Sequence, residues 1–182
     1  MAVPATFTSV DFSGKFTPNS SLSDSTETIL EHQGVGWMKR KAINAITLTL
    51  GLRHFKDDSG VEHIEVSRTV KGSSAEKAED RVLDWKEVRN DDGMLGPVTT
   101  RARGVQVSEL DVDFLKQGWT ADTVQHGLVQ ISARSDKPWT ANQCWGIEDV
   151  KGERRYTRRI KFTGPKGQDV EARLVYDYLG PL

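Results

Sequence analysis

Short segments in which apolar and polar residues alternate, separated by turn residues, run along most of this chain. Neighbouring side chains of a strand point to opposite faces of its sheet, so alternation with a period of two predicts strands buried on one face. Strands are predicted over residues 12–16, 47–56, 61–70, 81–88, 98–107, 124–133, 140–150, 154–162 and 170–179. About nine or ten short strands at hairpin spacing favour an antiparallel sandwich or a closed barrel.

Helical signals are concentrated in one block near the N-terminus. Asp24 is followed three residues later by Glu27, and this capping-box spacing predicts a short helix that ends at Gly34 and Gly36. Apolar residues then recur at helical spacing over residues 35–46, with basic residues on the other face. This block is expected to form a helical lid.

The elements together predict an all-β fold, an antiparallel up-and-down β-barrel with a short N-terminal helical lid. Closure of the sheet removes the edge strands that a long meander would otherwise expose. Residues 71–80 are predicted to form a polar loop, and residues 108–123 a less regular segment with one helical turn. Residues 90–93 are predicted to form a turn. Residues 1–10 are expected to be a loose lead-in, and residues 11–182 a single barrel domain.

Composition and charge exclude several classes of function. The 25 Lys and Arg residues nearly balance the 26 Asp and Glu residues, so a net charge of −1 provides no field to attract nucleic acid. Because no apolar run is long enough to span a bilayer, no stable membrane insertion is expected. The single cysteine, Cys144, excludes an internal disulfide and a cysteine-based zinc site. A lone thiol, and no signal-peptide pattern in residues 1–8, predict a cytoplasmic protein.

Three motifs follow one another near the N-terminus. They are Phe-Ser-Gly-Lys-Phe at 12–16, Ser-Ser-Leu-Ser at 20–23 and Gly-Val-Gly-Trp-Met-Lys-Arg-Lys-Ala at 34–42, and Arg-Leu-Val-Tyr-Asp-Tyr stands at 173–178. In these motifs the chain resembles the intracellular fatty-acid-binding proteins, which begin with such a strand, a helix pair and a hairpin. The resemblance implies a calycin or lipocalin-like barrel with an apolar ligand inside.

Two further segments give a second resemblance. Trp-Thr-Ala-Asn-Gln-Cys-Trp-Gly at 139–146 and Arg-Arg-Tyr-Thr-Arg at 154–158 make the whole chain similar to a group of fungal proteins of calycin type. The carboxylate clamp of the fatty-acid-binding family is not carried over. That family places an Arg and a Tyr two residues apart on its last strand, whereas Arg173 and Tyr176 are three apart and face opposite sides.

Because successive side chains of a strand alternate between its two faces, odd- and even-numbered positions can be compared to predict which side chains face the interior of the barrel. We call this the parity of a strand. The more apolar face of residues 170–179 includes Tyr176, and that of residues 154–162 includes Tyr156 and, with it, Arg158. A buried arginine needs a partner, which Glu87, an anionic ligand group or water could supply. The predicted ligand-binding residues are Trp85, Gln143, Trp145, Tyr156, Arg158 and Tyr176. An apolar cavity with a few fixed polar groups is typical of a small-molecule site.

No catalytic, phosphate-binding or dinucleotide motif occurs, and no cofactor and no metal site are expected. His63 and Glu65 lie on one predicted strand face with Ser and Thr, which favours a solvated surface over a metal or acid–base pair. His54 is expected to be a wall residue, and the sequence assigns no role to His126. Cys144 alternates with Gln143 and Trp145 and should face away from them, which disfavours a nucleophile.

Three functions are compatible with these features. The first is a binding module that holds a small hydrophobic or oxygenated organic molecule in the barrel cavity. The second is a cofactor-free, pericyclase-like cyclase or isomerase acting on a fungal secondary metabolite in the same cavity, where Tyr156, Arg158 and Tyr176 would polarise a carbonyl. The third is a structural or protein-interaction barrel with a filled core. The sequence does not separate catalysis from binding, nor does it give the oligomeric state.

Overall fold

A computed structural model describes residues 1–71, 76–91 and 93–182 of the chain. The strands are β1 (Gly14–Pro18), β2 (Leu48–Lys56), β3 (Glu62–Val70), β4 (Glu76–Val82), β5 (Val88–Asp91), β6 (Pro97–Val105), β7 (Leu128–Ser135), β8 (Thr140–Val150), β9 (Glu153–Thr163) and β10 (Asp169–Gly180). The helices are α1 (Glu27–His32), α2 (Trp37–Ala45), a short 3-10 turn η1 (Val107–Glu109), α3 (Asp113–Lys116) and α4 (Ala121–His126).

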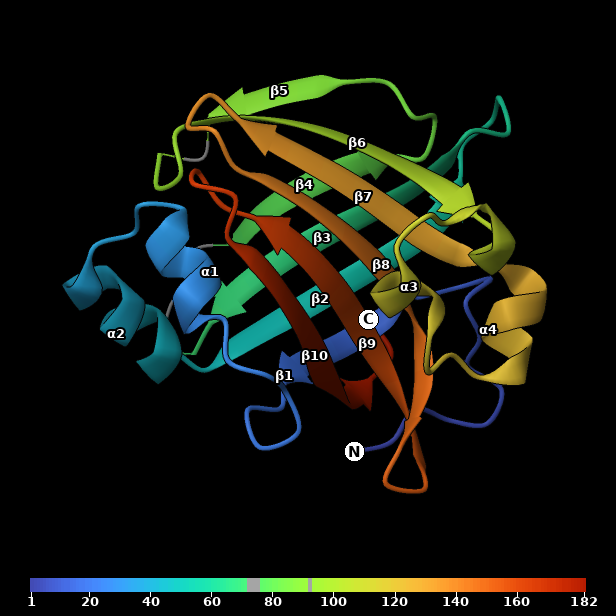
Figure 1. Cartoon of the computed structure of the whole chain (residues 1–182). Coiled ribbons are helices and arrows are strands. Elements are labelled where there is room, and N and C mark those ends of the chain that lie inside the picture. The colour runs from blue at the N-terminus through green and yellow to red at the C-terminus, as the bar shows by residue number, and fades with distance from the viewer. Residues whose placement is uncertain (72–75, 92) are drawn as a thin grey trace.

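All ten strands belong to one antiparallel sheet in the order β4-β3-β2-β1-β10-β9-β8-β7-β6-β5. Figure 1 shows the sheet curling around a common interior. Beyond β4 the chain reaches β6, where the backbone N–H of Trp85 donates to the carbonyl of Ala102 (2.8 Å) and Asp84 forms a bridge with Arg103. The predicted all-β, up-and-down barrel with a helical segment after the first strand is therefore confirmed, and its closure between β4 and β6 is short.

The alternation of apolar residues places one face of each strand in the interior. The main cluster combines side chains from both halves of the sheet, among them Ile64, Val66, Ile131 and Ile147, each at most 1% exposed. Another apolar cluster, which includes Trp139 and Phe162, fills the interior near α1. A separate cluster lies on the outer side of the sheet, where η1, α3 and the loop to α4 cover β7–β9.

The two N-terminal helices have different roles. Ile29 of α1 is buried with Trp139 and Phe162, so α1 covers one end of the interior, whereas α2 has no buried residue. Figure 1 shows both helices on one side of the sheet and α3 and α4 on the opposite side. The predicted capping box is wrong. The cap of α1 is Thr26, and the Asp24 carboxylate instead accepts the backbone N–H of Arg173 on β10 (2.7 Å).

The first ten residues, expected as a loose lead-in, pack into the barrel. Phe7 lies in the main cluster, with its ring 5.8 Å from that of Phe16 and 5.9 Å from that of Tyr178. Val3 is also buried, and its N–H donates to the carbonyl of Arg154 (2.9 Å). This segment closes the end of the barrel opposite α1.

Two stretches differ from the predicted elements. Residues 72–75 of the predicted loop 71–80 lie outside the described residues, but residues 76–80 belong to β4, and the predicted strand 81–88 stops at Val82. Charged residues on both faces of β4 hid its alternation. The predicted strand 124–133 begins instead at Leu128, because α4 precedes it and ends at Gly127, whose φ of 93° suits glycine. Of the predicted turn 90–93, residue 92 lies outside the described residues.

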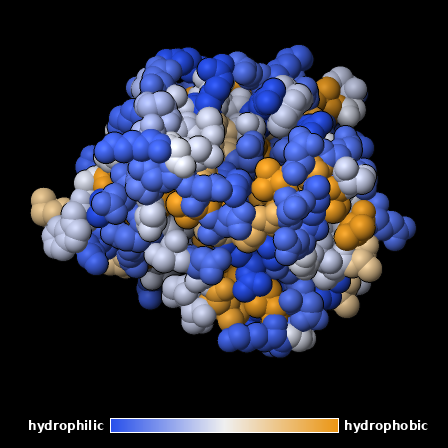
Figure 2. Space-filling view, viewed as in Figure 1, coloured by the Kyte–Doolittle hydropathy of each residue, from blue (hydrophilic) through white to orange (hydrophobic). Residues whose placement is uncertain are grey.

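The outer surface is mostly polar. Figure 2 shows one face on which hydrophilic residues predominate and hydrophobic residues occur in separate spots. Among the described residues, no helix is both long and apolar enough to cross a membrane.

Candidate functional site

Five of the six predicted ligand-binding residues meet on neighbouring strands in the interior. Strand pairing sets Trp145 of β8 beside Arg158 of β9, and Tyr156 of β9 beside Tyr176 of β10. Gln143 lies two residues before Trp145 on β8 and therefore on the same face. We call Trp145, Tyr156, Arg158 and Tyr176 the aromatic–arginine cluster. The sequence parity placed these residues on one face, and the register brings them into contact.

Arg158 occupies the centre of this cluster. Its guanidinium carbon lies 3.9 Å from the ring centre of Trp145, 5.0 Å from that of Tyr176 and 5.5 Å from that of Tyr156. Such distances give favourable cation–π contacts. Its Nε–H donates to the Tyr156 hydroxyl oxygen (2.8 Å), while its buried Nη2 has no hydrogen-bond partner among the described residues. The N–H groups of a guanidinium lie in its plane, so the free N–H groups of Arg158 can donate to a ligand while its faces contact aromatic rings.

The remaining polar atoms of the site are mainly donors. The indole N–H of Trp145 donates to Oε1 of Gln143 (2.9 Å), and since an indole nitrogen cannot accept, this bond identifies the amide oxygen. The Gln143 NH2 group therefore remains available to donate. The Tyr156 oxygen already accepts from Arg158, so its own proton is also available. Donors from Gln143, Tyr156 and Arg158 suit a ligand that offers acceptor oxygens.

Burial raises the pKa of the Tyr156 phenol well above its ordinary value, although the Arg158 and Arg81 guanidiniums act in the opposite direction. The phenol is therefore neutral at physiological pH and can donate a hydrogen bond. Arg158 stays cationic over the whole physiological range. Gln143, Arg158, Ile160 and Leu174 face the interior and are each only partly buried, so the middle of the interior is not completely filled by side chains.

A second polar group faces the same interior from β3 and β4. Arg81 pairs with the buried Ile64, and Glu79 with the buried Val66, so both side chains point inward. Glu79 accepts from Arg81 (2.8 Å) and from Arg68 (3.2 Å). We call Arg68, Glu79 and Arg81 the β3–β4 charged group. Sequence reasoning missed the group because Glu79 was assigned to the loop 71–80, and because Arg68 and Arg81, although placed in the predicted strands 61–70 and 81–88, were not recognised as interior residues.

Trp85 does not join the site, and its prediction as an interior residue is wrong. Its φ of 62° lies in the left-handed region and breaks the alternation after β4. Its ring instead makes cation–π contacts with the guanidiniums of Arg101 (4.2 Å) and Arg103 (4.6 Å) on the outer face of β6. Glu87, considered as a partner for Arg158, is also outside and pairs with Arg134 (2.7 Å).

The histidines lie apart from the aromatic–arginine cluster. The Phe12 N–H donates to Nδ1 of His54 (3.3 Å), so the protonated Nε2 donates to Glu62 (2.7 Å), as befits a wall residue. His63 contacts Asp80 and Asp57, and hydrogen bonding to Asp80 raises its pKa.

Three other residues that could act as an acid, a base or a nucleophile also lie apart from the aromatic–arginine cluster. His32 of α1 stacks on Phe162 (6.5 Å), a contact that sequence reasoning missed. His126 is exposed. Cys144 faces outward, as predicted, and burial raises its pKa to about 12.

The outer face of β8–β10 carries a buried ion-pair network. Glu148, 1% exposed, accepts from Arg159 (2.8 and 3.1 Å), from the Thr157 hydroxyl (3.0 Å) and from Arg173 (3.5 Å). Arg159 also donates to the carbonyl of Phe114 (3.2 Å). Since Arg173 is held outward while Tyr176 is inward, the structure agrees with the expectation that this pair forms no carboxylate clamp.

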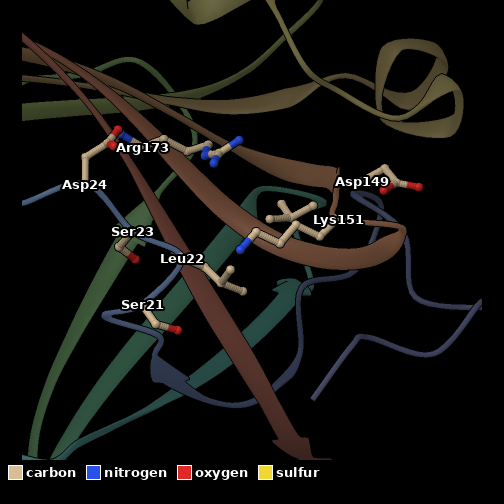
Figure 3. A pocket seen from close by; sticks show the side chains of 8 residues that line it. Ser21, Leu22, Ser23, Asp24, Asp149, Lys151 and Arg173 are labelled. Atoms are coloured by element: carbon tan, nitrogen blue, oxygen red, sulfur yellow. The ribbon is translucent and has the colours of Figure 1, made fainter.

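A polar pocket of about 390 Å³ adjoins this network outside the barrel. Figure 3 shows Arg173 and Lys151 reaching into it from β10 and from the β8–β9 turn, opposite the serines of the loop before α1. Its lining residues are Ser21, Leu22, Ser23, Asp24, Asp149, Val150, Lys151 and Arg173. It shares no residue with the aromatic–arginine cluster, whose convergent donors and aromatic rings make the interior the stronger candidate.

Two fungal proteins are similar to this chain over its whole length. "Probable pericyclase scpY" of Mollisia scopiformis is 29% identical over 183 residues, covering 99% of this chain and 96% of that protein. "Pericyclase pydY" of Acremonium sp is 30% identical over 190 residues, covering 100% and 98%. No family model matches the chain.

Solved structures of similar fold include a fatty-acid-binding protein and a fatty acid transporter. A fatty-acid-binding protein of Schistosoma mansoni in complex with arachidonic acid has a TM-score of 0.58 at 15% identity, covering 93% of this chain and 96% of that one. The REP1-NXSQ fatty acid transporter has a TM-score of 0.55 at 14% identity, covering 93% and 97%. At these identities the likeness concerns the fold, and it confirms the predicted resemblance to calycin-type barrels.

Proposed function

The chain belongs to the family of these two fungal pericyclases, and we propose that it binds a small hydrophobic, oxygenated molecule in its interior and catalyses a pericyclic reaction of it. The observation that carries the proposal is that Gln143, Tyr156 and Arg158 keep unused donors on one interior face of β8 and β9, beside aromatic rings. The fold of the fatty-acid-binding protein and the fatty acid transporter supports an apolar ligand at the same place. A binding module without catalysis is the second candidate, and the same cluster supports it.

A pericyclic reaction suits this set of side chains. Such a reaction moves π electrons within one substrate in a concerted step, so it needs no nucleophile and no proton transfer. An enzyme can accelerate it by folding a flexible chain into the reactive pose and by fixing hydrogen bonds where charge develops. Hydrogen bonds from Arg158 and Tyr156 to a conjugated oxygen of the substrate would stabilise negative charge that develops there in the transition state. Trp145 and Tyr176 would hold the unsaturated part by stacking.

We propose that the partner of this protein is a small molecule bound in its interior. We also propose that the protein is cytoplasmic, does not bind nucleic acid and is not inserted in a membrane. The near balance of 25 basic and 26 acidic residues supports the exclusion of nucleic acid. The single buried thiol of Cys144 is compatible with a reducing compartment. Imaging of a fluorescent fusion in the producing organism tests the location.

The test of catalysis uses a strain from which the gene has been deleted. A pericyclic cyclisation retains every atom, so we expect the deletion strain to accumulate a compound of the same mass as the missing product but with different retention. Purified protein added to an extract of that strain should convert the first compound into the second. Neither change would occur if the chain were only a carrier, and native mass spectrometry would then show a bound molecule without turnover.

The assignment of residues is tested with the double variant Tyr156→Phe/Arg158→Met. It removes two donors while preserving most of the volume, and we expect conversion in the extract to fall by about 10²-fold or more, the size seen when stabilising donors are removed. Arg134→Met, on the outer face, is the matched control and should convert normally. Full conversion by the double variant would refute this site.

A further inference from the structure

We propose that the ligand carries an anionic oxygen, as a carboxylate or an enolate, which Arg158 of β9 and Arg81 of β4 bind together. This inference rests on the proposed function, because it takes the interior as the ligand site and names the chemical class of ligand. It differs from the clamp of the fatty-acid-binding proteins, since it uses neither Arg173 nor a pair of residues on β10.

The interior has an excess of positive charge. Arg158 stands among neutral aromatic rings, and the β3–β4 charged group adds two arginines but only one carboxylate. Glu79 is shared, since it accepts from both Arg68 and Arg81. Three guanidiniums therefore face one carboxylate among the described side chains here. Arg68 and Glu79 are partly exposed to solvent, at 35% and 28%, so the charges held away from bulk water are mainly those of Arg158 and Arg81. A buried cation is unfavourable unless a negative group compensates it.

Both arginines also keep an unused donor. Nη2 of Arg158 and Nε of Arg81 are buried and have no hydrogen-bond partner among the described residues. The Arg81 side chain is 14% exposed, so little of it reaches solvent. Buried polar atoms are usually paired, and a set of free N–H groups on two guanidiniums is complementary to an oxyanion with several lone pairs.

The electrostatic coupling shows that the two arginines influence each other across the interior. Burial lowers the pKa of Arg81, Glu79 counteracts this, and the nearby charge of Arg158 lowers it further. Burial lowers the pKa of Arg158 too, but Tyr156 and Tyr176 together raise it above its ordinary value, so Arg158 remains a cation near Arg81. A bound anion would turn the repulsion into two attractions, whereas a neutral carbonyl could accept hydrogen bonds but would leave the charge uncompensated.

The apolar part of such a ligand has a place beside the charges. Ile160 and Leu174 are neighbours of Gln143 and Arg158 in the sheet and are only partly buried. They connect the aromatic–arginine cluster with the apolar cluster under α1. A molecule with a charged oxygen at one end and an unsaturated chain at the other fits this arrangement.

The experiment compares ligands that differ only in charge. cis-Parinaric acid and its methyl ester are fluorescent polyenes of the same shape, and a 3-acyl-4-hydroxy-2-pyrone and its methyl ether form the corresponding enolate pair. Fluorescence and calorimetric titrations of the wild-type protein should show that at least one charged member binds about tenfold or more tightly than its neutral partner. Preference for the acid alone identifies a carboxylate site, and preference for the pyrone alone an enolate site.

Variants connect the preference to the two arginines. Arg81→Met and Arg158→Met should each abolish the charge preference, while Arg81→Lys should retain part of it and Arg134→Met all of it. Circular dichroism and thermal unfolding establish that each variant is folded, and Arg81→Lys keeps the test decisive if Arg81→Met does not fold.

Equal affinity for charged and neutral partners in the wild type overturns the inference, as does binding of neither charged probe. Its failure can be distinguished from failure of the proposed function. Conversion in the deletion-strain extract without any charge preference would leave catalysis standing and remove the anion site. A charge preference without conversion would leave a carrier that binds anions.

Discussion

Replacement of Glu148 by alanine should strongly destabilise the fold, although Glu148 lies on the outer side of the barrel. Its carboxylate is 1% exposed and accepts two hydrogen bonds from Arg159, one from Thr157 and one from Arg173. Within the described part of the chain, Arg159, 8% exposed, would keep only the Phe114 carbonyl as a hydrogen-bond partner. The variant therefore leaves a buried cation almost uncompensated.

Breaking a buried ion pair by removing one partner costs about 3–5 kcal/mol, and Glu148→Ala should lower the free energy of unfolding by that amount. For a chain of this size the melting temperature should fall by about 6–20 °C. Urea unfolding followed by circular dichroism measures the first quantity, and calorimetry the second. Asp136→Ala is the control. It breaks the exposed pair with Arg89 (2.5 Å) and should cost less than about 1 kcal/mol.

A double variant separates the charge effect from packing. Glu148→Leu combined with Arg159→Met removes both charges and retains apolar volume, so it should be more stable than Glu148→Ala. Two results would contradict this account of the network that holds α3 and the following loop on β8 and β9. One is that Glu148→Ala costs less than about 1 kcal/mol, and the other is that the double variant is less stable than Glu148→Ala.

Three other predictions concern separate parts of the molecule. Phe7→Ala should cost about 3–5 kcal/mol in urea unfolding because it opens a cavity in the main cluster, and a loose lead-in would give almost no change. His63 has a raised pKa, so the stabilisation it provides is present below its ordinary value of 6.5 and disappears as the pH rises through the folded-state pKa. The deficit of His63→Gln should thus be larger at about pH 5.5 than at about pH 8.5, and a reversed order would contradict the assignment. The thiol of Cys144, with its pKa raised to about 12, should react with a disulfide reagent only in denaturant, and rapid labelling of the native protein would show that the outer cluster opens readily.

The sequence alone predicts the part of the site that regular strands carry. On β8, β9 and β10 the period of two continues without interruption, so parity placed Gln143, Trp145, Tyr156, Arg158 and Tyr176 correctly on one face. Their mutual contact depends on strand register, which parity does not supply. The barrel itself was predictable because most strands are buried on one face and are joined by turn residues.

The remaining part depends on local backbone geometry and on charges in unusual places. Trp85 leaves the alternation through a left-handed residue, which a large side chain rarely adopts and which no sequence pattern marks. Glu79 was missed because a strand whose inward face is charged has the composition of a loop. Phe7 was missed because its packing depends on tertiary contact with Phe16 and Tyr178 rather than on any period.

The pairing of β1 with β10 has a consequence for biosynthesis. Phe16 lies opposite Tyr178, so β10, which joins the two halves of the sheet, is synthesised after the other nine strands. Until it emerges, β1 has an unpaired edge next to an apolar face, and β1–β4 cannot close around the interior. Contacts between residues so distant in sequence slow folding. Nascent chains of this protein should therefore depend on chaperones for most of their synthesis.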